Sequence, residues 1–181
     1  MSDVSPRDVL DFWIKAGPKK WWKKDADFDQ QIASQFGETY HLACDGQLDH
    51  WSQSPEGALA LILVLDQFSR NLHRNSPLAF AQDDRCVDLV KQQIASGNDR
   101  KMPSEINEFC YLPLMHSEAL EDQDLCLAEM QRLDKKDNVK AAVEHRDIIE
   151  KFGRFPHRNK VLGRETTTAE QRFLDEGGFA G

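Results

Sequence analysis

The segment from Lys151 to Arg164, KFGRFPHRNKVLGR, gathers residue types that bind anions or transfer protons. It contains arginines, lysines and one histidine and has no acidic residue, although the formal net charge of the chain is -8. Arginine presents a planar fork of donors that matches carboxylates and phosphates, and histidine titrates near neutral pH. The segment therefore predicts one of two arrangements. Either it cradles an anion, or its arginines bond helix carbonyls and internal carboxylates and hold the last helix in place.

The backbone of this segment is predicted to be irregular. Gly153 and Pro156 interrupt any regular helix, so the arginines lie on irregular chain whose backbone N–H groups need partners. Backbone N–H groups together with guanidinium groups form anion-binding concavities. Arg158 and Asn159 also repeat an arginine–asparagine pair found earlier in the chain, again shortly after a phenylalanine.

That earlier pair, Arg70 and Asn71, follows the apolar run ALALILVLDQF. Asp66 and Arg70 are four residues apart, so both lie on one face of a helix and can pair. Because the pair is next to a buried stripe, it is partly desolvated and needs complete hydrogen bonding. The pair therefore either faces a ligand or ties two helices together.

A histidine is predicted to lie on an apolar helix face. His116 continues a stripe at helical spacing, and Pro113 is expected to kink or end that helix. Ser117 is expected to cap the next helix, with Glu118 in its first turn. As a catalyst, His116 or His157 would act as general acid or base; the alternative is a satisfied core histidine.

Arg146 interrupts another apolar stripe and needs acceptors for its donors, which Asp66, Glu118 or Glu150 can supply. The nearby histidine and acidic residues lack the spacing of a helical metal site, because both H-E-x-x-H and E-x-x-H are absent. The motifs of serine hydrolases, P-loop proteins and dinucleotide-binding folds are absent too. The sequence therefore predicts no metal and no cofactor.

Three functions follow from these residues. The first is a binding module with a pocket for a small anionic ligand or an acidic peptide. The second is a hydrolase-type enzyme, and the third is a purely structural buried polar network. The candidate catalytic residues are His116, Glu118 and His157. The candidate ligand-binding residues are Asp66, Arg70, Asn71, Arg146, Arg154, Arg158, Asn159, Arg164 and Glu165.

A second basic stretch, Lys15–Lys24 (KAGPKKWWKK), contains two tryptophans among five lysines. Such a stretch is compatible with a membrane-surface or nucleic-acid contact. The favoured interpretation is that one tryptophan closes the core and that the lysines are solvated.

The elements that position these residues are predicted to be helices. Serine–proline pairs at residues 5–6, 54–55 and 76–77 are typical helix starts, and Thr168 with Gln171 suggests a capping box. No segment shows the alternation of a strand. The fold class is therefore all-α. Roughly eight helices with short loops favour stacked antiparallel hairpins, in one domain over residues 1–181.

Composition limits the partners. The acidic net charge argues against a general nucleic-acid binder, and no apolar run approaches the length of a membrane span. The four cysteines lie in apolar helical patterns and are expected to be buried free thiols, which suits a reducing compartment. The start of the sequence has no signal-peptide pattern. We expect a cytoplasmic protein that is a monomer or a weak homo-oligomer, with no nucleic-acid or membrane partner.

Three stretches, LALILVLDQFSRNLHR, FCYLPLMHSEALEDQ and HRDIIEKFGRFPHRNKVLGRETT, resemble the bacterial family catalogued as domain of unknown function 924. The resemblance extends over nearly the whole chain. It implies an all-helical, tetratricopeptide-repeat-like superhelix and no known activity. This sequence has Ser69 where proline is expected and Met115 where a more polar residue is common. The family's polar signature falls on Asp66, Gln67, Arg70, Asn71, His116, Ser117, Glu118, His145, Arg146, Arg154, His157, Arg158, Asn159, Arg164 and Glu165.

Overall fold

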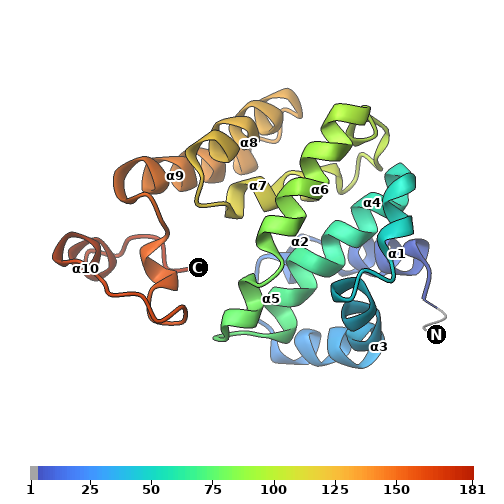
Figure 1. Cartoon of the computed structure of the whole chain (residues 1–181), viewed down its shortest axis with the longest axis horizontal. Coiled ribbons are helices and arrows are strands. Elements are labelled where there is room, and N and C mark those ends of the chain that lie inside the picture. Colours follow the sequence, from blue (N-terminus) through green and yellow to red (C-terminus); the bar gives the residue numbers. More distant parts are fainter. Residues whose placement is uncertain (1–3) are drawn as a thin grey trace. The chain divides into compact units, whose positions relative to one another are not determined.

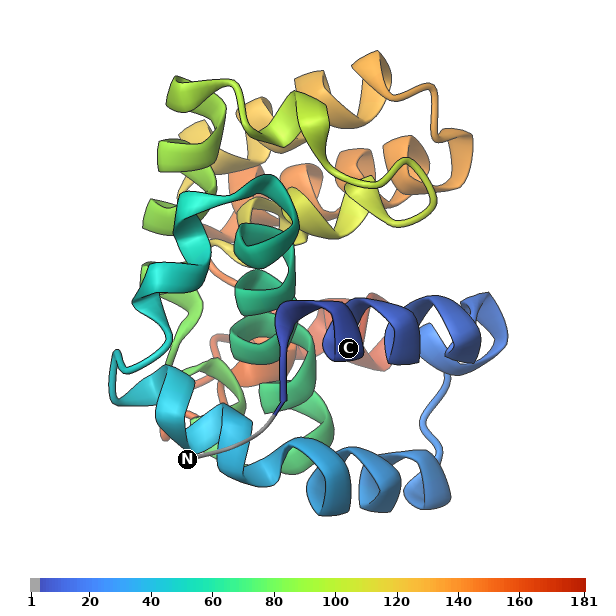
Figure 2. The same cartoon turned by 90° about the vertical axis from the view of Figure 1, so that its right-hand side faces the viewer.

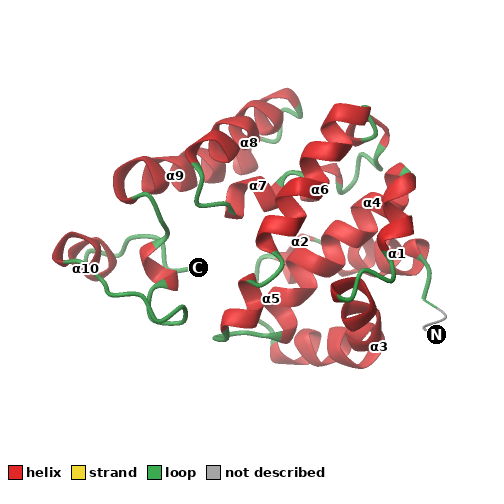
Figure 3. Cartoon of the chain, in the orientation of Figure 1, coloured by secondary structure: helices red, strands yellow, loops and turns green. Residues whose placement is uncertain are grey.

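The computed structural model describes residues 4–181, and every regular element in that range is helical (Figures 1 and 3), which confirms the all-α class. The described chain divides into two compact units. The first unit contains the described residues up to Arg74 together with Leu78–Pro113. The second contains Asn75–Pro77 and Leu114–Gly181. The single domain and the tetratricopeptide-like stacking stay predictions.

The first unit is built around one long buried helix. This helix starts as α4, continues through a π-helical turn labelled η2, and ends as α5, forming the upright column in Figure 2. The α-helices of this unit are α1 (Pro6–Ala16), α2 (Pro18–Trp21), α3 (Ala26–Cys44), α4 (Pro55–Ile62), α5 (Ser69–Leu72) and α6 (Asp83–Ser96). The π turn η2 is Leu63–Phe68, and the 3-10 turns are η1 (Asp49–Gln53), η3 (Pro77–Phe80), η4 (Asp99–Lys101) and η5 (Asn107–Cys110).

The long helix is central because it is apolar on all sides. All its residues from Gly57 to Ser69 are buried, with α1, α3 and α6 packed around them. Its start is fixed by Ser54, whose hydroxyl accepts a hydrogen bond from the Gly57 N–H at 3.1 Å. Gly57 itself allows close packing, because a Cβ atom there would lie 2.2 Å from the Trp51 carbonyl oxygen.

The second unit is a helical hairpin followed by an irregular segment and a last helix. Helix α7 (Leu112–His116) leads into it, α8 (Leu120–Arg132) and α9 (Lys136–Phe152) pack side by side, and η6 (Pro156–Arg158) and α10 (Thr168–Asp175) follow. Helix α9 ends where Gly153 adopts the left-handed conformation, at φ 70°. Its core residues are Ile148, Ile149 and Phe155, with Phe152, Phe173 and Phe179 packed against them.

Two capping predictions are corrected by the structure. The last capping box is formed by Thr167 and Glu170, one residue before the predicted Thr168 and Gln171, because the carboxylate of Glu170 accepts the Thr167 N–H at 2.7 Å. Ser117 does not cap α8 in the standard way. Its hydroxyl accepts the Ala119 N–H at 3.2 Å and lies 2.6 Å from an Asp122 carboxylate oxygen.

The four cysteines are free: Cys86, Cys110 and Cys126 are buried, whereas Cys44 is only partly so. Among residues 4–181 we find no helix with the length and apolar character needed to cross a bilayer.

Candidate functional site

In the first unit, the predicted pair of Asp66 and Arg70 is present and has a further partner. The Arg70 guanidinium lies 3.1 Å from the fully buried carboxylate of Asp66, and it forms a two-pronged pair with Asp83, both distances being 3.0 Å. Burial opposes the charge of Arg70, but the two carboxylates outweigh it and raise the pKa of Arg70. Asp83 was not a sequence candidate, because it is 13 residues from Arg70 and begins another helix.

The π turn also gives the Asp66 carbonyl oxygen extra partners. This oxygen accepts from the Ser69 hydroxyl at 2.7 Å and from Arg70 at 2.9 Å. Asn71, the neighbour of Arg70, donates to an Asp29 oxygen at 2.7 Å, and Arg74 pairs with the same carboxylate. These contacts join α3 and α6 to the central helix, as the tether interpretation of Asp66 and Arg70 predicts.

In the second unit, Arg164 and Glu118 form the centre of a polar network. Arg164 makes a two-pronged pair with Glu118, at 2.7 and 3.0 Å, and donates to the Phe155 carbonyl at 3.1 Å. Glu118 also accepts the Phe155 N–H at 2.8 Å. Burial opposes the negative charge, but the bonds from Arg164 and Phe155 outweigh it and lower the pKa of Glu118. The hydrogen bonds of Glu118 therefore go to an arginine and a backbone N–H.

A second ion pair connects the irregular segment to α10. Arg154 contacts both carboxylate oxygens of Glu170, at 2.6 and 2.9 Å, and donates to the Glu165 carbonyl at 2.7 Å. Glu170 is only 2% exposed, and the Arg154 bond is the main cause that lowers the pKa of Glu170 to about 2. Glu165 takes part through its backbone carbonyl.

Asn159 bridges the two ion pairs. Its side-chain oxygen accepts from Arg164 at 2.9 Å, and its side-chain nitrogen lies 3.3 Å from a Glu170 oxygen. Because Asn159 is buried, one amide group connects Arg164 to Glu170 of α10. Arg154, Asn159, Arg164 and Glu165 thus lie together, in an arrangement where carboxylates and carbonyls accept the arginine donors.

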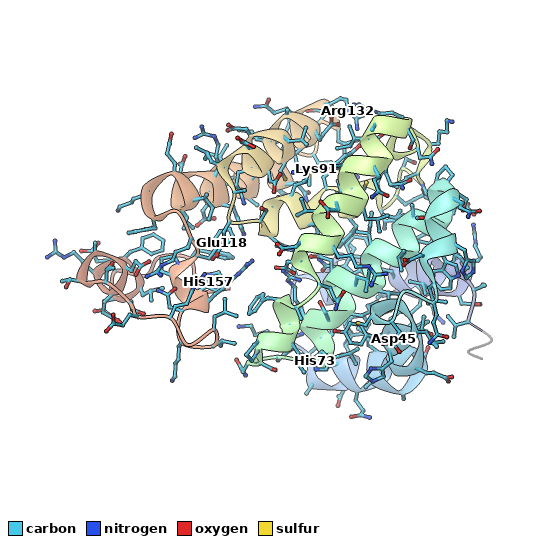
Figure 4. The ribbon with its side chains drawn as sticks, in the orientation of Figure 1. Asp45, His73, Lys91, Glu118, Arg132 and His157 are labelled. Atoms are coloured by element: carbon cyan, nitrogen blue, oxygen red, sulfur yellow. The ribbon has the colours of Figure 1, made fainter. Side chains whose placement is uncertain are left out.

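The remaining candidates in this unit lie beside the network. Arg158 is buried; it donates to the His116 carbonyl oxygen at 2.9 Å and its guanidinium lies 4.6 Å from the centre of the Phe155 ring. The contact thus uses the His116 backbone. His157 has a buried Nδ1 with no hydrogen-bond partner among the described residues, and burial, helped by Arg158, lowers the pKa of His157 to about 4. Figure 4 shows Glu118 and His157 in the same part of this unit.

A second histidine, His145, accompanies His157. Its Nδ1 lies 2.8 Å from the Ala141 carbonyl oxygen, and its ring packs against Phe155 and Phe179 at 5.5 and 4.5 Å between centroids. Burial lowers the pKa of His145 to about 4. Both histidines are therefore neutral at pH 7, and a nitrogen with so low a pKa is a weak base there.

Arg146 lies apart from this network. It pairs with Asp124 at 2.5 Å and with Glu150 at 3.1 Å, joining α8 to α9 at the surface. Glu150 was among the three predicted acceptors; Asp124 was missed because it lies on the preceding helix. Arg146 was expected to belong to a buried site, but both of its ion pairs are exposed to solvent.

The second unit also contains a groove that sequence reasoning missed. It has a volume of about 570 Å³ and lies between α9, α10 and the segment after α10. Val143 in this groove is 40% exposed, although valine favours burial. The sequence did hold a signal for this groove. The lining residues of α9 recur every three or four residues, which places apolar and charged side chains next to each other on one face of the helix. The lining residues are Lys140, Val143, Glu144, Asp147, Ile148, Lys151, Phe152, Phe173, Gly178 and Phe179.

Lys151 lies over the aromatic part of the groove. Its ammonium lies 4.9 Å from the Phe152 ring centre and 5.9 Å from that of Phe173. Among residues 4–181 no carboxylate pairs with Lys151 within 4 Å, which contrasts with Arg154 and Arg164. Within residues 4–181, no group of three or more side chains could together hold a metal ion.

A family model for bacterial proteins of unknown function, DUF924, matches residues 9–178. The chain belongs to this family. The matched range includes the network around Arg164 and every residue that lines the groove except Phe179.

A solved structure of similar length has the same fold. A protein of unknown function from Agrobacterium tumefaciens is 41% identical, with a TM-score of 0.91 over 95% of this chain and 97% of that chain. A comparison with curated proteins gives no significant match.

Proposed function

We propose that this member of the family is a binding protein, and that its ligand is a small carboxylate with an apolar body, held in the groove between α9 and α10. The observation that carries the proposal is the position of Lys151, whose ammonium lies over two phenylalanine rings beside open space. An apolar ligand body would pack on the rings, and its carboxylate would pair with the ammonium.

The size and lining of the groove support a small ligand. Ligand sites in proteins have volumes of roughly 300–1,000 Å³ and combine apolar walls with a few polar groups. The groove has about 570 Å³, and Phe152, Phe173 and Phe179 supply aromatic walls. Lys140 and Lys151 line it as well, with Glu144 and Asp147 between them along α9. An anion is therefore favoured near either lysine, away from the two acids.

The arginine residues are less suited to this task. The donors of Arg154 and Arg164 that face Glu170 and Glu118 are already bonded to carboxylates. A ligand anion would have to displace a protein carboxylate that is close by at all times. This competition favours a structural role for the arginine network, which we propose as its function: it fixes α10 and the irregular segment, and so one wall of the groove.

The proposal is tested by measuring thermal unfolding and ligand-observed NMR with phenylacetate and octanoate. Phenylacetamide and octanamide serve as neutral analogues of the same shape. A carboxylate at about 100 times its dissociation constant stabilises the fold by about 2.7 kcal/mol. We expect the carboxylates to bind and the amides to bind at least tenfold more weakly. Equal binding of acid and amide, or no binding of either, would reject the proposal.

Three variants locate the ligand. Lys151→Met keeps most of the side-chain length and removes the charge, so it is expected to weaken carboxylate binding. Lys136→Met, which makes the same change on an exposed lysine of α9 outside the groove lining, is the matched control. If Arg158→Ala abolishes binding while Lys151→Met leaves it intact, the ligand binds the arginine network instead and the groove assignment is wrong.

A further inference from the structure

The first unit carries an exposed aromatic and basic patch on and around α2, remote in sequence from the groove. Residues 14–24, IKAGPKKWWKK, contain five lysines and no acid, whereas the whole chain has a net charge of -8. In Figure 2, α1 and the chain that follows it are drawn in dark blue. A local cluster of positive charge on an acidic protein attracts polyanions to that place specifically.

The two tryptophans of this patch have different roles. Trp21 closes the core: its indole N–H donates to the Trp13 carbonyl at 2.8 Å, and its ring lies 5.0 Å from Phe109 in an edge-on arrangement. Trp22 stacks on Phe109, with 5.4 Å between ring centres and only 7° between planes, and yet is 57% exposed. The sequence predicted that one tryptophan would close the core, and it did not anticipate a second one supported on one face and open to solvent.

The support under Trp22 is rigid. Phe109 is buried and packs against Trp13 as well as against both tryptophans of the patch. The Trp22 ring is therefore held in place before any partner arrives, and preorganised groups lose little entropy on binding. An aromatic ring held flat with one open face is a stacking surface for another flat ring.

The lysines around Trp22 are available to a partner. Lys20 pairs with Asp25, but within the described part of the chain Lys15, Lys19, Lys23 and Lys24 have no carboxylate within 4 Å. All four are exposed. Lys19 is three residues before Trp22, which places it on the same side of the turn.

We propose that Trp22, with Lys19, Lys23 and Lys24, binds single-stranded nucleic acid. A single strand supplies both features the patch matches: phosphates for the lysines, and an unpaired base whose ring stacks on the indole. A duplex hides the faces of its bases inside the stack. The expectation that the chain has no nucleic-acid partner rested on its negative net charge. This patch is locally positive, so that argument does not apply to it.

An anionic membrane surface is the competing partner, and the geometry favours it less. Helices that lie in a membrane surface present a broad apolar face along their length. Helix α2 has only four residues, and the large exposed apolar residues of this stretch are Trp22 and Ile14. One stacked ring among lysines matches a base and a phosphate chain better than a lipid layer.

Binding is tested by fluorescence anisotropy with a labelled oligothymidylate of about 12 nucleotides, between about 50 and 200 mM salt. The full chain is used, and quenching of tryptophan fluorescence is recorded in the same titrations. We expect Trp22→Ala to weaken binding at least about fivefold, the lower end of the range for one base–aromatic stack. Trp22→Phe should retain part of the affinity. Circular dichroism checks that each variant is folded.

A charge-matched pair of variants tests the lysines. Lys23→Glu with Lys24→Glu removes two phosphate contacts, so the slope of log affinity against log salt should become shallower by about 1.4, at about 0.7 per contact for a single strand. Lys101→Glu with Lys160→Glu changes the net charge equally at exposed lysines elsewhere and should keep the slope.

Four outcomes would overturn the proposal. They are no binding of the oligonucleotide at the lowest salt, equal losses in the two charge-reversed variants, duplex DNA binding as tightly as the single strand, and tryptophan quenching by anionic vesicles but not by the oligonucleotide. The last result would assign the patch to a membrane surface.

Discussion

The network around Arg164 and the groove beside Lys151 lie in the same unit and differ in how their cations are used. In the network, Arg154 and Arg164 face carboxylates at 2.6–3.0 Å. In the groove, Lys151 lies over two aromatic rings, and no carboxylate of residues 4–181 is within 4 Å of its ammonium. The arginines of the basic segment thus pair internally, whereas Lys151, at the start of the same segment, has no carboxylate partner among the described residues. The predictions below test this contrast.

The largest effect is expected from removing a carboxylate of the network. Glu170→Ala leaves Arg154 without its partner and removes the capping box of α10, so we expect a loss of about 4 kcal/mol in the free energy of unfolding. Urea denaturation measures this loss. Glu176→Ala, just after α10 and exposed, is the control and should change stability by less than about 0.5 kcal/mol. A small loss in Glu170→Ala would mean that the network does not hold α10.

A pH dependence follows from the buried histidine next to the network. The pKa of His145 is about 4 in the fold against 6.5 in a free side chain, so the unfolded chain binds more protons between these values. The contribution of His145 to the free energy of unfolding is therefore fully present above pH 6.5. It is lost as the pH falls towards 4, by up to about 3 kcal/mol.

The His145 contribution is isolated by comparing wild type with His145→Leu in urea titrations at several pH values. The variant should show a flatter decline between pH 6.5 and 4. If both proteins lose stability equally over this range, other groups are responsible, and the buried neutral state of His145 does not contribute as expected.

An intermediate effect is expected at the bridge between the two ion pairs. Asn159→Ala removes the acceptor of Arg164 and a donor to Glu170, both in buried surroundings, which should cost about 2 kcal/mol. Asn138→Ala, a partly buried asparagine of α9, serves for comparison and should cost less. Equal stability of Asn159→Ala and wild type would show that the two ion pairs are independent of each other.

The smallest effect on stability is expected in the groove. Lys151→Met exchanges a charge for an apolar end group over the Phe152 and Phe173 rings, and the free energy of unfolding should change by less than about 0.5 kcal/mol. This variant separates the two regions, because it should alter ligand binding without altering the fold. If Lys151→Met lowered the free energy of unfolding as much as Glu170→Ala, Lys151 would have a structural role, and the groove would not differ from the network.

The sequence predicted the fold class and the contacts that are local along the chain. The Asp66–Arg70 pair was predictable because its members are four residues apart on one helix, and the Ser54 cap because it precedes a proline and an apolar run. The partners of the irregular segment were not predictable in the same way. Glu118 and Arg164 are 46 residues apart, and no periodicity links a loop to a helix start at that distance.

The groove was missed, and the exposed Trp22 within the basic stretch was not anticipated, for a different reason. Both depend on which apolar side chains stay exposed, and a stripe of valine and phenylalanine in α9 suggests burial when it is read from sequence alone. Only the packing of Phe173 and Phe179 shows that one side of α9 is left partly open. Likewise, Trp21 and Trp22 are adjacent and chemically identical, yet the Trp21 indole N–H bonds to the Trp13 carbonyl whereas Trp22 is 57% exposed.

The π turn at Leu63–Phe68 sets the rotational phase of everything that follows it on the central helix. A π turn accommodates one residue more than an α turn, and each residue rotates an α-helix by about 100°. If the same residues formed an ordinary α turn instead, every later residue would be rotated by about 100°, and Asn71 would turn about a quarter of a circle away from Asp29. The number of residues in this one turn, and not only side-chain identity, therefore aims the end of the helix at its neighbours.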